Sequence, residues 1–257
     1  MNGDQDILLL RLDAPLMSFG APMVDERGVI QPFPALSMLT GLLANALGYD
    51  HRDEERLGAL QERIRYASRC DRKGEMLRDY QTVDLDPETS PWMDPRQVGW
   101  TTRGRVAERG GGKAKKGTHI RFRDYWADSV HTVAVLLDPA EKEPGVQQLA
   151  GAIEWPARPL FIGRKCCLPA TRILLGVVRA PSLICALARC ARPDARRKPD
   201  SGRLSAWWFD GDDASASAGG SRVIPVTDER DWHNQIHVGR RLMRHGQIDP
   251  PEAGHGS

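Results

Sequence analysis

No stretch of this chain approaches the roughly 18 consecutive apolar residues that a membrane-spanning helix requires. The first residues, MNGDQD, are acidic, and they have neither the basic start nor the apolar middle of a secretory signal. A chain of 257 residues that is 40% hydrophobic and 27% charged can nevertheless build a sizeable core under a polar surface. We therefore expect a protein of the cytoplasm with no membrane association.

Cysteine is scarce, with five residues at scattered positions and no CxxC pair. An odd number of scattered cysteines is typical of reduced cytosolic thiols and not of a disulfide framework. The lack of CxxC argues against a zinc site, and no carboxylate cluster suggests the Mg²⁺ chemistry of a nuclease. We expect neither a metal nor another cofactor.

Positive charge is concentrated in one stretch, residues 96–123, although the formal net charge of the whole chain is only +2. The stretch holds nine Lys or Arg residues and one acid, with three consecutive glycines in its middle. Aromatic residues, Trp100 and Phe122, lie among the cations, and Ile120 and Phe122 alternate as in a strand. A long basic hairpin that contacts a polyanion is the interpretation we favour. A solvated surface loop is the alternative.

Hydrophobic periodicity predicts an α+β fold. The expected order is strand, helix, strand, strand, strand, helix, strand, which resembles the ferredoxin-like β-α-β-β-α-β plan. The expected strands are 7–12, 64–70, 76–83, 130–137, 172–178 and 223–226, and the expected helices are 35–47, 53–64, 146–153 and 181–190.

The chain is expected to divide into two parts near residue 180. We expect a main domain over 1–180 and a C-terminal extension over 181–246. Residues 191–220 are rich in Arg, Asp, Ser, Ala and Gly and predict a flexible insert, apart from Trp207-Trp208-Phe209, which we expect to pack or pair as a strand. Residues 247–257 are expected to form a disordered tail.

Five segments in order resemble a known family. Together they are similar to the CasD subunits of type I-E CRISPR Cascade complexes, which belong to the RAMP superfamily. The resemblance covers about residues 7 to 180. The segments are Arg11-Leu12 to Pro15 with Ser18-Phe19-Gly20; Phe33-Pro34 with Ser37 and residues 41–48; Arg78-Asp79-Tyr80-Gln81-Thr82-Val83; Asp124-Tyr125-Trp126-Ala127-Asp128 leading into 133–137; and 159–161 with Gly163-Arg164-Lys165, Cys167 and Pro169.

The resemblance implies a ferredoxin-like, RRM-derived RAMP body with a protruding β-hairpin, the thumb, at about 81–123, and a small β-rich C-terminal extension. It implies a non-catalytic subunit that binds the 5′ handle of the CRISPR RNA (crRNA) and caps the backbone filament of CasC subunits. Contact with the large subunit CasA, and a part in target DNA binding during antiviral defence, follow from the same resemblance.

The RNA-binding residues are carried over in the same way, together with the basic residues of the thumb. Arg103, Arg105, Lys115 and Arg164 are expected to contact phosphates. Phe19, Tyr80 and Trp100 are the candidates for base stacking, although Tyr80 is equally compatible with a place in the core. Here Phe19 stands where relatives usually have Trp. The full expected set is Phe19, Gly20, Arg27, Ser37, Arg78, Tyr80, Arg103, Arg105, Lys113, Lys115, Arg164 and Lys165.

The alternative function is a metal-independent endoribonuclease that processes CRISPR repeat RNA. A related branch, in type I-C systems, cleaves guide precursors with Tyr, Lys and His residues, and the candidates here are Tyr80, His119, His131 and Lys165. Acid–base cleavage requires such groups to converge on one 2′-hydroxyl and its leaving oxygen. Because His131 lies in a strand pattern and His119 in the basic stretch, we favour the non-catalytic role.

Overall fold

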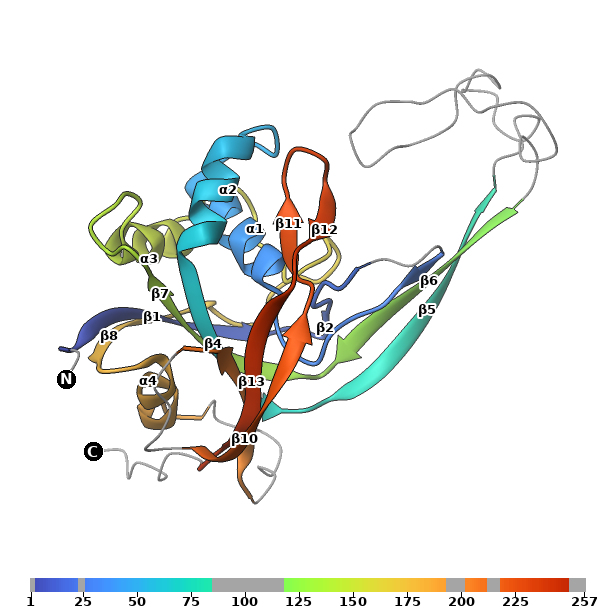
Figure 1. The fold of residues 1–257 in the computed structure, drawn as a ribbon. Coiled ribbons are helices and arrows are strands. Elements are labelled where there is room, and N and C mark those ends of the chain that lie inside the picture. Colours follow the sequence, from blue (N-terminus) through green and yellow to red (C-terminus); the bar gives the residue numbers. More distant parts are fainter. Residues whose placement is uncertain (1–2, 23–25, 85–117, 193–201, 212–217, 250–257) are drawn as a thin grey trace.

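The computed structural model describes residues 3–22, 26–84, 118–192, 202–211 and 218–249. Its centre is a seven-stranded sheet in which every neighbouring pair is antiparallel (Figure 1). The strand order is β10-β13-β9-β4-β7-β1-β8. The strands are β1 (Gln5–Asp13), β4 (Ile64–Arg72), β7 (Val130–Leu137), β8 (Leu174–Ala180), β9 (Leu204–Phe209), β10 (Ala218–Val226) and β13 (Arg241–Ile248).

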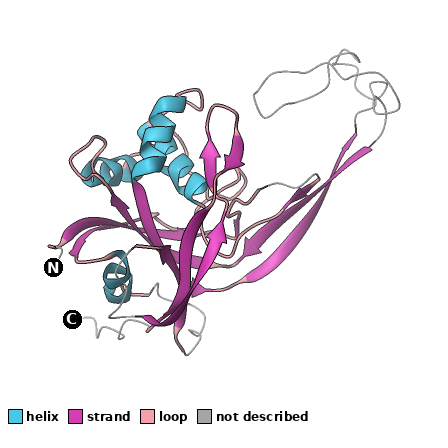
Figure 2. Cartoon of the chain, viewed as in Figure 1, coloured by secondary structure: helices cyan, strands magenta, loops and turns pink. Residues whose placement is uncertain are grey.

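Helices cover both faces of this sheet, which explains the continuous apolar run at the start of the chain. In β1, Leu8, Leu10 and Leu12 pack in the core beneath three helices, whereas Ile7 and Leu9 pack against α4 on the opposite face. Successive residues of a strand point to opposite faces, so a strand that is buried on both sides loses its polar alternation. The helices are α1 (Leu36–Leu47), α2 (Glu54–Arg63), α3 (Val146–Glu154) and α4 (Leu183–Arg189), and Figure 2 shows α4 apart from the other three.

A long hairpin projects from this body. It pairs β5 (Glu75–Asp84) with β6 (Thr118–Ala127) in continuous antiparallel register (Figure 1). The other edge of β6 carries the short strands β2 (Leu16–Met17) and β3 (Arg27–Gly28). The paired strands thus begin and end outside the predicted range 81–123. The predicted RNA-binding residues Arg103, Arg105, Lys113 and Lys115, together with Trp100, lie outside the described residues.

The C-terminal part of the chain is built into the main sheet. Strand β9 pairs with β4, and β13 and β10 continue the sheet beyond it. The expected strand at Trp207-Trp208-Phe209 is therefore present, and Trp208 is fully buried because α4 covers it. Strand β9 also includes residues 204–206, and β13 reaches the buried Ile248, so these residues of the predicted insert (191–220) and tail (247–257) belong to the sheet.

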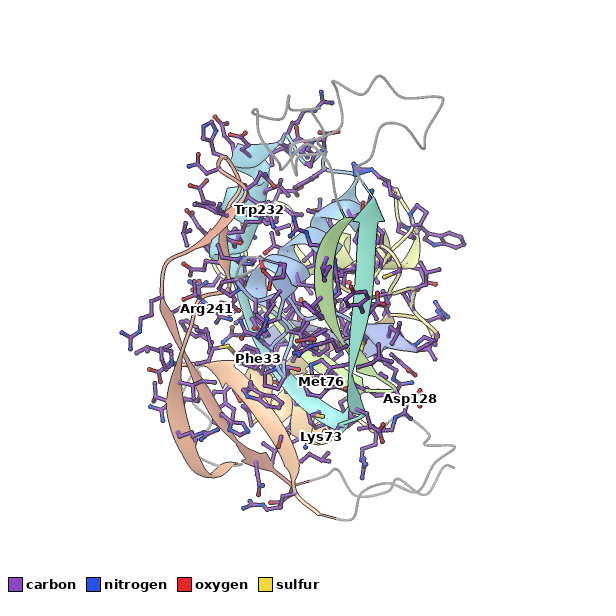
Figure 3. All side chains as sticks on the ribbon, turned by 90° about the vertical axis from the view of Figure 1, so that its right-hand side faces the viewer. Phe33, Lys73, Met76, Asp128, Trp232 and Arg241 are labelled. Carbon is purple, nitrogen blue, oxygen red and sulfur yellow. The ribbon has the colours of Figure 1, made fainter. Side chains whose placement is uncertain are left out.

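A buried ion pair joins this C-terminal part to the first helix. Arg241 donates from Nε and Nη2 to the two carboxylate oxygens of Asp228, at 2.6 and 2.7 Å. Asp228, which is fully buried, also accepts the backbone N–H of Leu36 at 2.8 Å through Oδ2 and that of Ser37 at 3.0 Å through its carbonyl. The N-terminus of α1 is thereby capped from a distant segment, which Figure 3 locates by the labelled Arg241. Beside α1 and α2 lies a small hairpin of β11 (Glu229–Asp231) and β12 (Ile236–Val238).

Two negative findings concern the described residues only. No helix among them is long and apolar enough to cross a membrane. Within the same ranges, no group of three or more His, Cys, Asp or Glu residues is arranged to hold a metal ion.

Candidate nucleic-acid interface

The predicted RNA-binding residues that the structure brings together lie at the base of the β5–β6 hairpin. The register places Arg78 opposite Asp124, Asp79 opposite Arg123 and Tyr80 opposite Phe122. Because side chains alternate between the two faces of a strand pair, the hairpin has two different faces. We call them the aromatic face, with Met76, Arg78, Tyr80, Ile120, Phe122 and Asp124, and the basic face, with Asp79, Gln81, Arg121 and Arg123.

The aromatic face presents apolar side chains to solvent. Tyr80 is 56% exposed, and its ring meets that of Phe122 edge-on with 5.6 Å between centroids. Met76, labelled in Figure 3, and Ile120 are also exposed. Of the two interpretations of Tyr80, the core position is excluded, and a ring with an open face is available for a base.

On the basic face, two arginines converge on Gly28 of β3. A Cβ atom at Gly28 would lie 2.8 Å from Nη2 of Arg164 and 3.7 Å from Nη1 of Arg123, so glycine leaves room for both guanidinium groups. Arg123 donates from Nε to the side-chain oxygen of Gln81 at 3.3 Å. Arg27 precedes Gly28 and has 63% of its side chain exposed. Cations from three separate segments, Arg27 in β3 itself, Arg123 in β6 and Arg164 in a loop, therefore meet at this short strand.

Arg164 holds this arrangement together. It donates to the carbonyl oxygens of Asp124 at 2.8 Å and of Gly28 at 3.1 Å, and its guanidinium lies over the ring of Tyr125, 4.6 Å from the centroid. The loop that carries it is closed by two backbone hydrogen bonds of 2.8 Å, from the N–H of Ile162 to the carbonyl of Cys167 and from the N–H of Cys167 to the carbonyl of Arg164. Arg164 is consequently half-buried and anchored, whereas its neighbour Lys165 is exposed.

An ion pair links the aromatic face to the same centre. Arg78 donates from Nε to Oδ1 of Asp124 at 2.7 Å and from Nη2 to Oδ2 at 3.1 Å. The Arg78 hydrogen bond holds the pKa of the Asp124 carboxyl below its usual range, with the charges of Arg164 and Arg27 acting in the same direction. Asp124 is therefore ionised at neutral pH.

Two predicted contacts are not available in this structure. Phe19 is fully buried, with its ring edge-on to His131 at 4.9 Å, and so it has no face for a base. Ser37 is buried, and its Oγ lies 3.2 Å from Nε2 of His237. The backbone N–H groups of Leu36 and Ser37 at the start of α1 are already hydrogen-bonded to Asp228. Gly20 forms a bridge with Ile30 and lies near the buried Phe19.

The endoribonuclease candidates do not gather around His131. This imidazole is buried between the hydroxyl groups of Ser68 and Ser129, at 3.3 and 3.1 Å, and burial lowers its pKa to about 3. A buried, neutral histidine inside the main sheet cannot reach an RNA 2′-hydroxyl. Tyr80 and Lys165 are exposed, and the side chain of His119 lies outside the described residues.

The low pKa of His131 predicts an acid-sensitive fold. The ordinary histidine pKa of 6.5 exceeds the folded value of about 3, so the unfolded state takes up the proton first. The contribution of His131 to stability is complete above pH 6.5 and is lost below it, by roughly 2 kcal/mol between pH 7 and 5. Urea unfolding at the two pH values should show this loss. A His131→Asn variant should show a smaller loss, and equal losses in both proteins would contradict the assignment.

Sequence reasoning missed three residues of the interface. Arg121 and Arg123 were counted within the basic stretch but were not assigned to a face, and Asp124 was quoted only as part of a motif. The signal is the period of two in Arg121-Phe122-Arg123-Asp124, which puts the two arginines on one face of the strand and Phe122 and Asp124 on the other.

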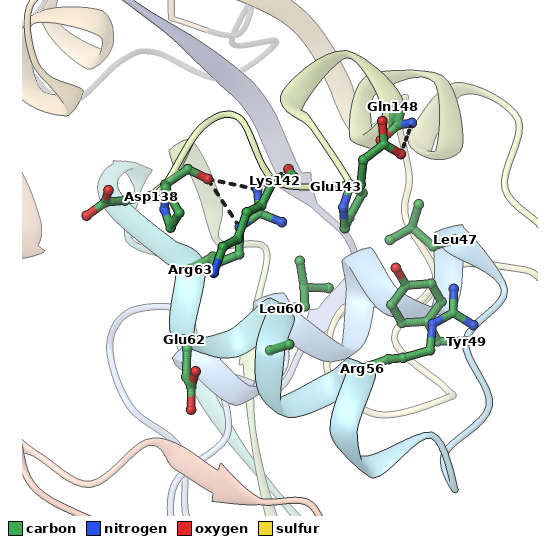
Figure 4. Close-up of a pocket in the computed structure, with 13 residues that line it drawn as sticks. Leu47, Tyr49, Arg56, Leu60, Glu62, Arg63, Asp138, Lys142, Glu143 and Gln148 are labelled. Atoms are coloured by element: carbon green, nitrogen blue, oxygen red, sulfur yellow. Dashed lines mark hydrogen bonds between the residues drawn. The ribbon is translucent and has the colours of Figure 1, made fainter.

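A separate cleft of about 780 Å³ lies among the helices, between α2 and the loop before α3 (Figure 4). Arg63 closes one side by donating to the carbonyl of Pro139 at 3.0 Å. The lining combines three cations and three acids with an apolar floor, so it lacks the single sign of charge expected of a phosphate site. The charged lining residues are Arg56, Arg63, Lys142, Glu62, Asp138 and Glu143.

Two solved structures have a fold similar to that of this chain. A chain of a CRISPR RNA-guided surveillance complex has a similar fold, with a TM-score of 0.61 and 21% identity, over 96% of this chain and 91% of that chain. A crystal structure of a Cas protein gives a TM-score of 0.56 and 22% identity, over 96% of this chain and 98% of that one.

The sequence comparisons name the family. The model described as CRISPR-associated protein (Cas_Cas5) matches residues 7–244, and the chain belongs to this family. The CRISPR system Cascade subunit CasD of Escherichia coli (strain K12) is 30% identical over 173 residues, which cover 67% of this chain and 71% of that protein. The resemblance seen in the sequence is thus confirmed, as is the α+β class with mainly antiparallel sheets.

Proposed function

We propose that this protein is a non-catalytic subunit of a type I-E Cascade complex that binds the 5′ handle of the crRNA in the cytoplasm. In this proposal it caps the backbone filament of CasC subunits, contacts CasA and contributes to target DNA binding. The observation that carries the proposal is the group of cations near Gly28, formed by Arg27, Arg123 and Arg164, on a hairpin whose aromatic face carries the exposed ring of Tyr80. Guanidinium groups and an open aromatic ring are the usual partners of RNA phosphates and bases.

The strand arrangement supports an RRM-derived body. Strands β4, β7, β1 and β8 are neighbours in that order, and the chain runs β1, α1 and α2, β4, β7, α3, β8. This order supports the proposed ferredoxin-like fold, in which the β5–β6 hairpin, inserted between β4 and β7, is proposed to be the thumb. The domain boundary at residue 180 stays a prediction.

Contacts of this kind grip the backbone and do not identify bases. Arginine and lysine neutralise phosphates and release counterions, so affinity falls steeply as salt rises. In an RNA-guided complex the target sequence is recognised by base pairing, and the protein is required to hold the guide.

An endoribonuclease remains the second candidate function, and the residues left to carry it are His119, Tyr80 and Lys165. Cleavage of repeat RNA in EDTA that is lost in His119→Ala would support it.

Charge reversal at the interface tests the proposal. The double variant Arg27→Glu/Lys165→Glu changes two exposed side chains. We expect its dissociation constant for single-stranded RNA to rise tenfold or more, and each tenfold rise corresponds to a loss of about 1.4 kcal/mol of binding free energy. The slope of log affinity against log salt should also become shallower, by about 0.7 for each lost phosphate contact. Fluorescence anisotropy with RNA transcribed from the CRISPR repeat of the source genome measures both quantities.

The matched control is Lys142→Glu/Arg189→Glu, which makes the same charge change on exposed residues of the α3 loop and α4. We expect this control to lose much less affinity. Equal losses in the two double variants would mean that only net charge matters, and the interface would then have no special role. Co-purification with CasC and CasA separates RNA binding from subunit assembly.

A further inference from the structure

Asp124 is the unexpected member of the interface, because it places a negative charge where phosphates are proposed to bind. Only 8% of its side chain is exposed. Both of its carboxylate oxygens are engaged by Arg78, and its backbone carbonyl accepts a hydrogen bond from Arg164 at 2.8 Å. One residue therefore contacts two of the arginines proposed to bind RNA, one through its side chain and one through its backbone.

The geometry of the pair leaves part of Arg78 free for another partner. A guanidinium has five N–H donors, and a fork through Nε and Nη2 uses two of them. Arg78 keeps 51% of its side chain exposed, and its Nη1 has no hydrogen-bond partner within the described residues. Its remaining donors are held at a fixed position on the aromatic face, on the same face as Tyr80.

The ion pair between Arg78 and Asp124 is also held in place by its surroundings. Asp124 lies opposite Arg78 in the register of the hairpin, and Asp124 is fixed in turn by Arg164, which bridges to Gly28 of β3 at 3.1 Å. A flexible arginine loses conformational freedom when it binds a phosphate. An arginine already held by a buried carboxylate has lost that freedom before the RNA arrives.

From this geometry we propose that Asp124 is a positioning residue for RNA binding, which orients Arg78 so that its free N–H groups meet a phosphate of an RNA strand whose base contacts Tyr80. The inference rests on the proposed function, because it needs RNA at this interface. It makes a prediction opposite to that of simple electrostatics. Removing a negative charge from a basic surface should strengthen RNA binding, whereas removing a positioning residue should weaken it.

The test uses the full-length protein and a fluorescein-labelled 20-nucleotide oligouridine RNA, with anisotropy recorded at one fixed salt concentration. Asp124→Asn keeps the shape of the side chain and removes its charge. We expect this variant to bind the RNA roughly two- to tenfold more weakly than the wild type. The matched control is Glu75→Gln, which removes one negative charge from the exposed start of the same hairpin. It should bind at least as tightly as the wild type.

A double-mutant cycle isolates the dependence on Arg78. In a background of Arg78→Ala there is no guanidinium to orient, so adding Asp124→Asn should cause no further loss and should instead raise affinity. Asp124→Asn is thus expected to lower RNA affinity when Arg78 is present and to raise it when Arg78 is replaced by alanine. Equal or stronger binding by Asp124→Asn in the wild-type background would overturn the proposal.

A second variant guards against misfolding, since Asp124 is nearly buried. Arg78→Lys keeps the positive charge but cannot form the two-pronged fork, and it leaves Asp124 in place. It should weaken binding to the same degree as Asp124→Asn, with an unchanged thermal midpoint. If Arg78→Lys bound RNA with wild-type affinity, the orienting role of Asp124 would be refuted, even if Asp124→Asn bound RNA weakly. An absence of RNA binding by the wild-type protein would instead overturn the proposed function itself.

Discussion

Replacement of Asp228 by alanine is expected to lower the free energy of unfolding by about 3–5 kcal/mol, because it leaves a buried partner uncompensated. Arg241 would lose both hydrogen bonds of its fork, with 11% of its side chain exposed and little water to replace them. The N–H of Leu36 would also lose its acceptor at the start of α1. Urea unfolding followed by circular dichroism measures the change.

The ion pair between Asp210 and Arg244 supplies a matched control. It has the same carboxylate–guanidinium chemistry at 2.7 Å, but both partners are partly exposed. Because exposed ion pairs contribute little, Asp210→Ala should cost no more than about 1 kcal/mol. Similar losses in Asp210→Ala and Asp228→Ala would show that burial and helix capping do not make Asp228 special.

Substitution of Gly163 by alanine is expected to damage stability and RNA binding together. Gly163 has a φ angle of +92°, and an added Cβ atom would lie 1.8 Å from the carbonyl oxygen of Ser18. Backbone has to move to remove that overlap, at a cost of roughly 2–4 kcal/mol. The movement displaces the next residue, Arg164, from the carbonyl groups of Gly28 and Asp124. RNA affinity should therefore fall even where the protein is still folded.

Gly151 offers the corresponding control, since it lies inside α3 and an added Cβ atom would meet nothing within 4 Å. Gly151→Ala should raise the free energy of unfolding by up to about 1 kcal/mol, because alanine favours the helix. It should leave RNA affinity unchanged. A stable Gly163→Ala protein with wild-type affinity would show that the loop around Arg164 adapts without consequence.

Local patterns were sufficient to predict most elements of the fold. The apolar run of β1, the leucine periodicity of α1 and the alternation of Ile120 and Phe122 each depend on neighbours in the sequence. The family resemblance also depends on short segments in order. The ends of the hairpin were less well predicted, because Met76 and Leu77 look like an ordinary buried strand although both are exposed.

The features that could not be predicted depend on contacts between residues that are distant in the sequence. Ser37 lies in the first turn of a helix, and its sequence neighbours do not reveal that Asp228 caps the helix from 192 positions beyond Leu36. Phe19 looks accessible in a loop next to Gly20, but His131 from another strand packs against its ring. Asp124, by contrast, was not predicted to belong to the site. Its proposed role depends on a strand register that aligns it with Arg78, 46 positions earlier.

The capping of α1 by Asp228 has a consequence for synthesis of the chain. A ribosome releases α1 long before it releases Asp228 and Arg241, and it also releases β4 before β9, which covers the edge of that strand. During this interval the nascent chain has an uncapped helix and an open strand edge, both of which favour misassociation. Folding of the body is therefore completed only after Arg241 has been released, and a message truncated soon after codon 180 would yield a product that chaperones and proteases recognise.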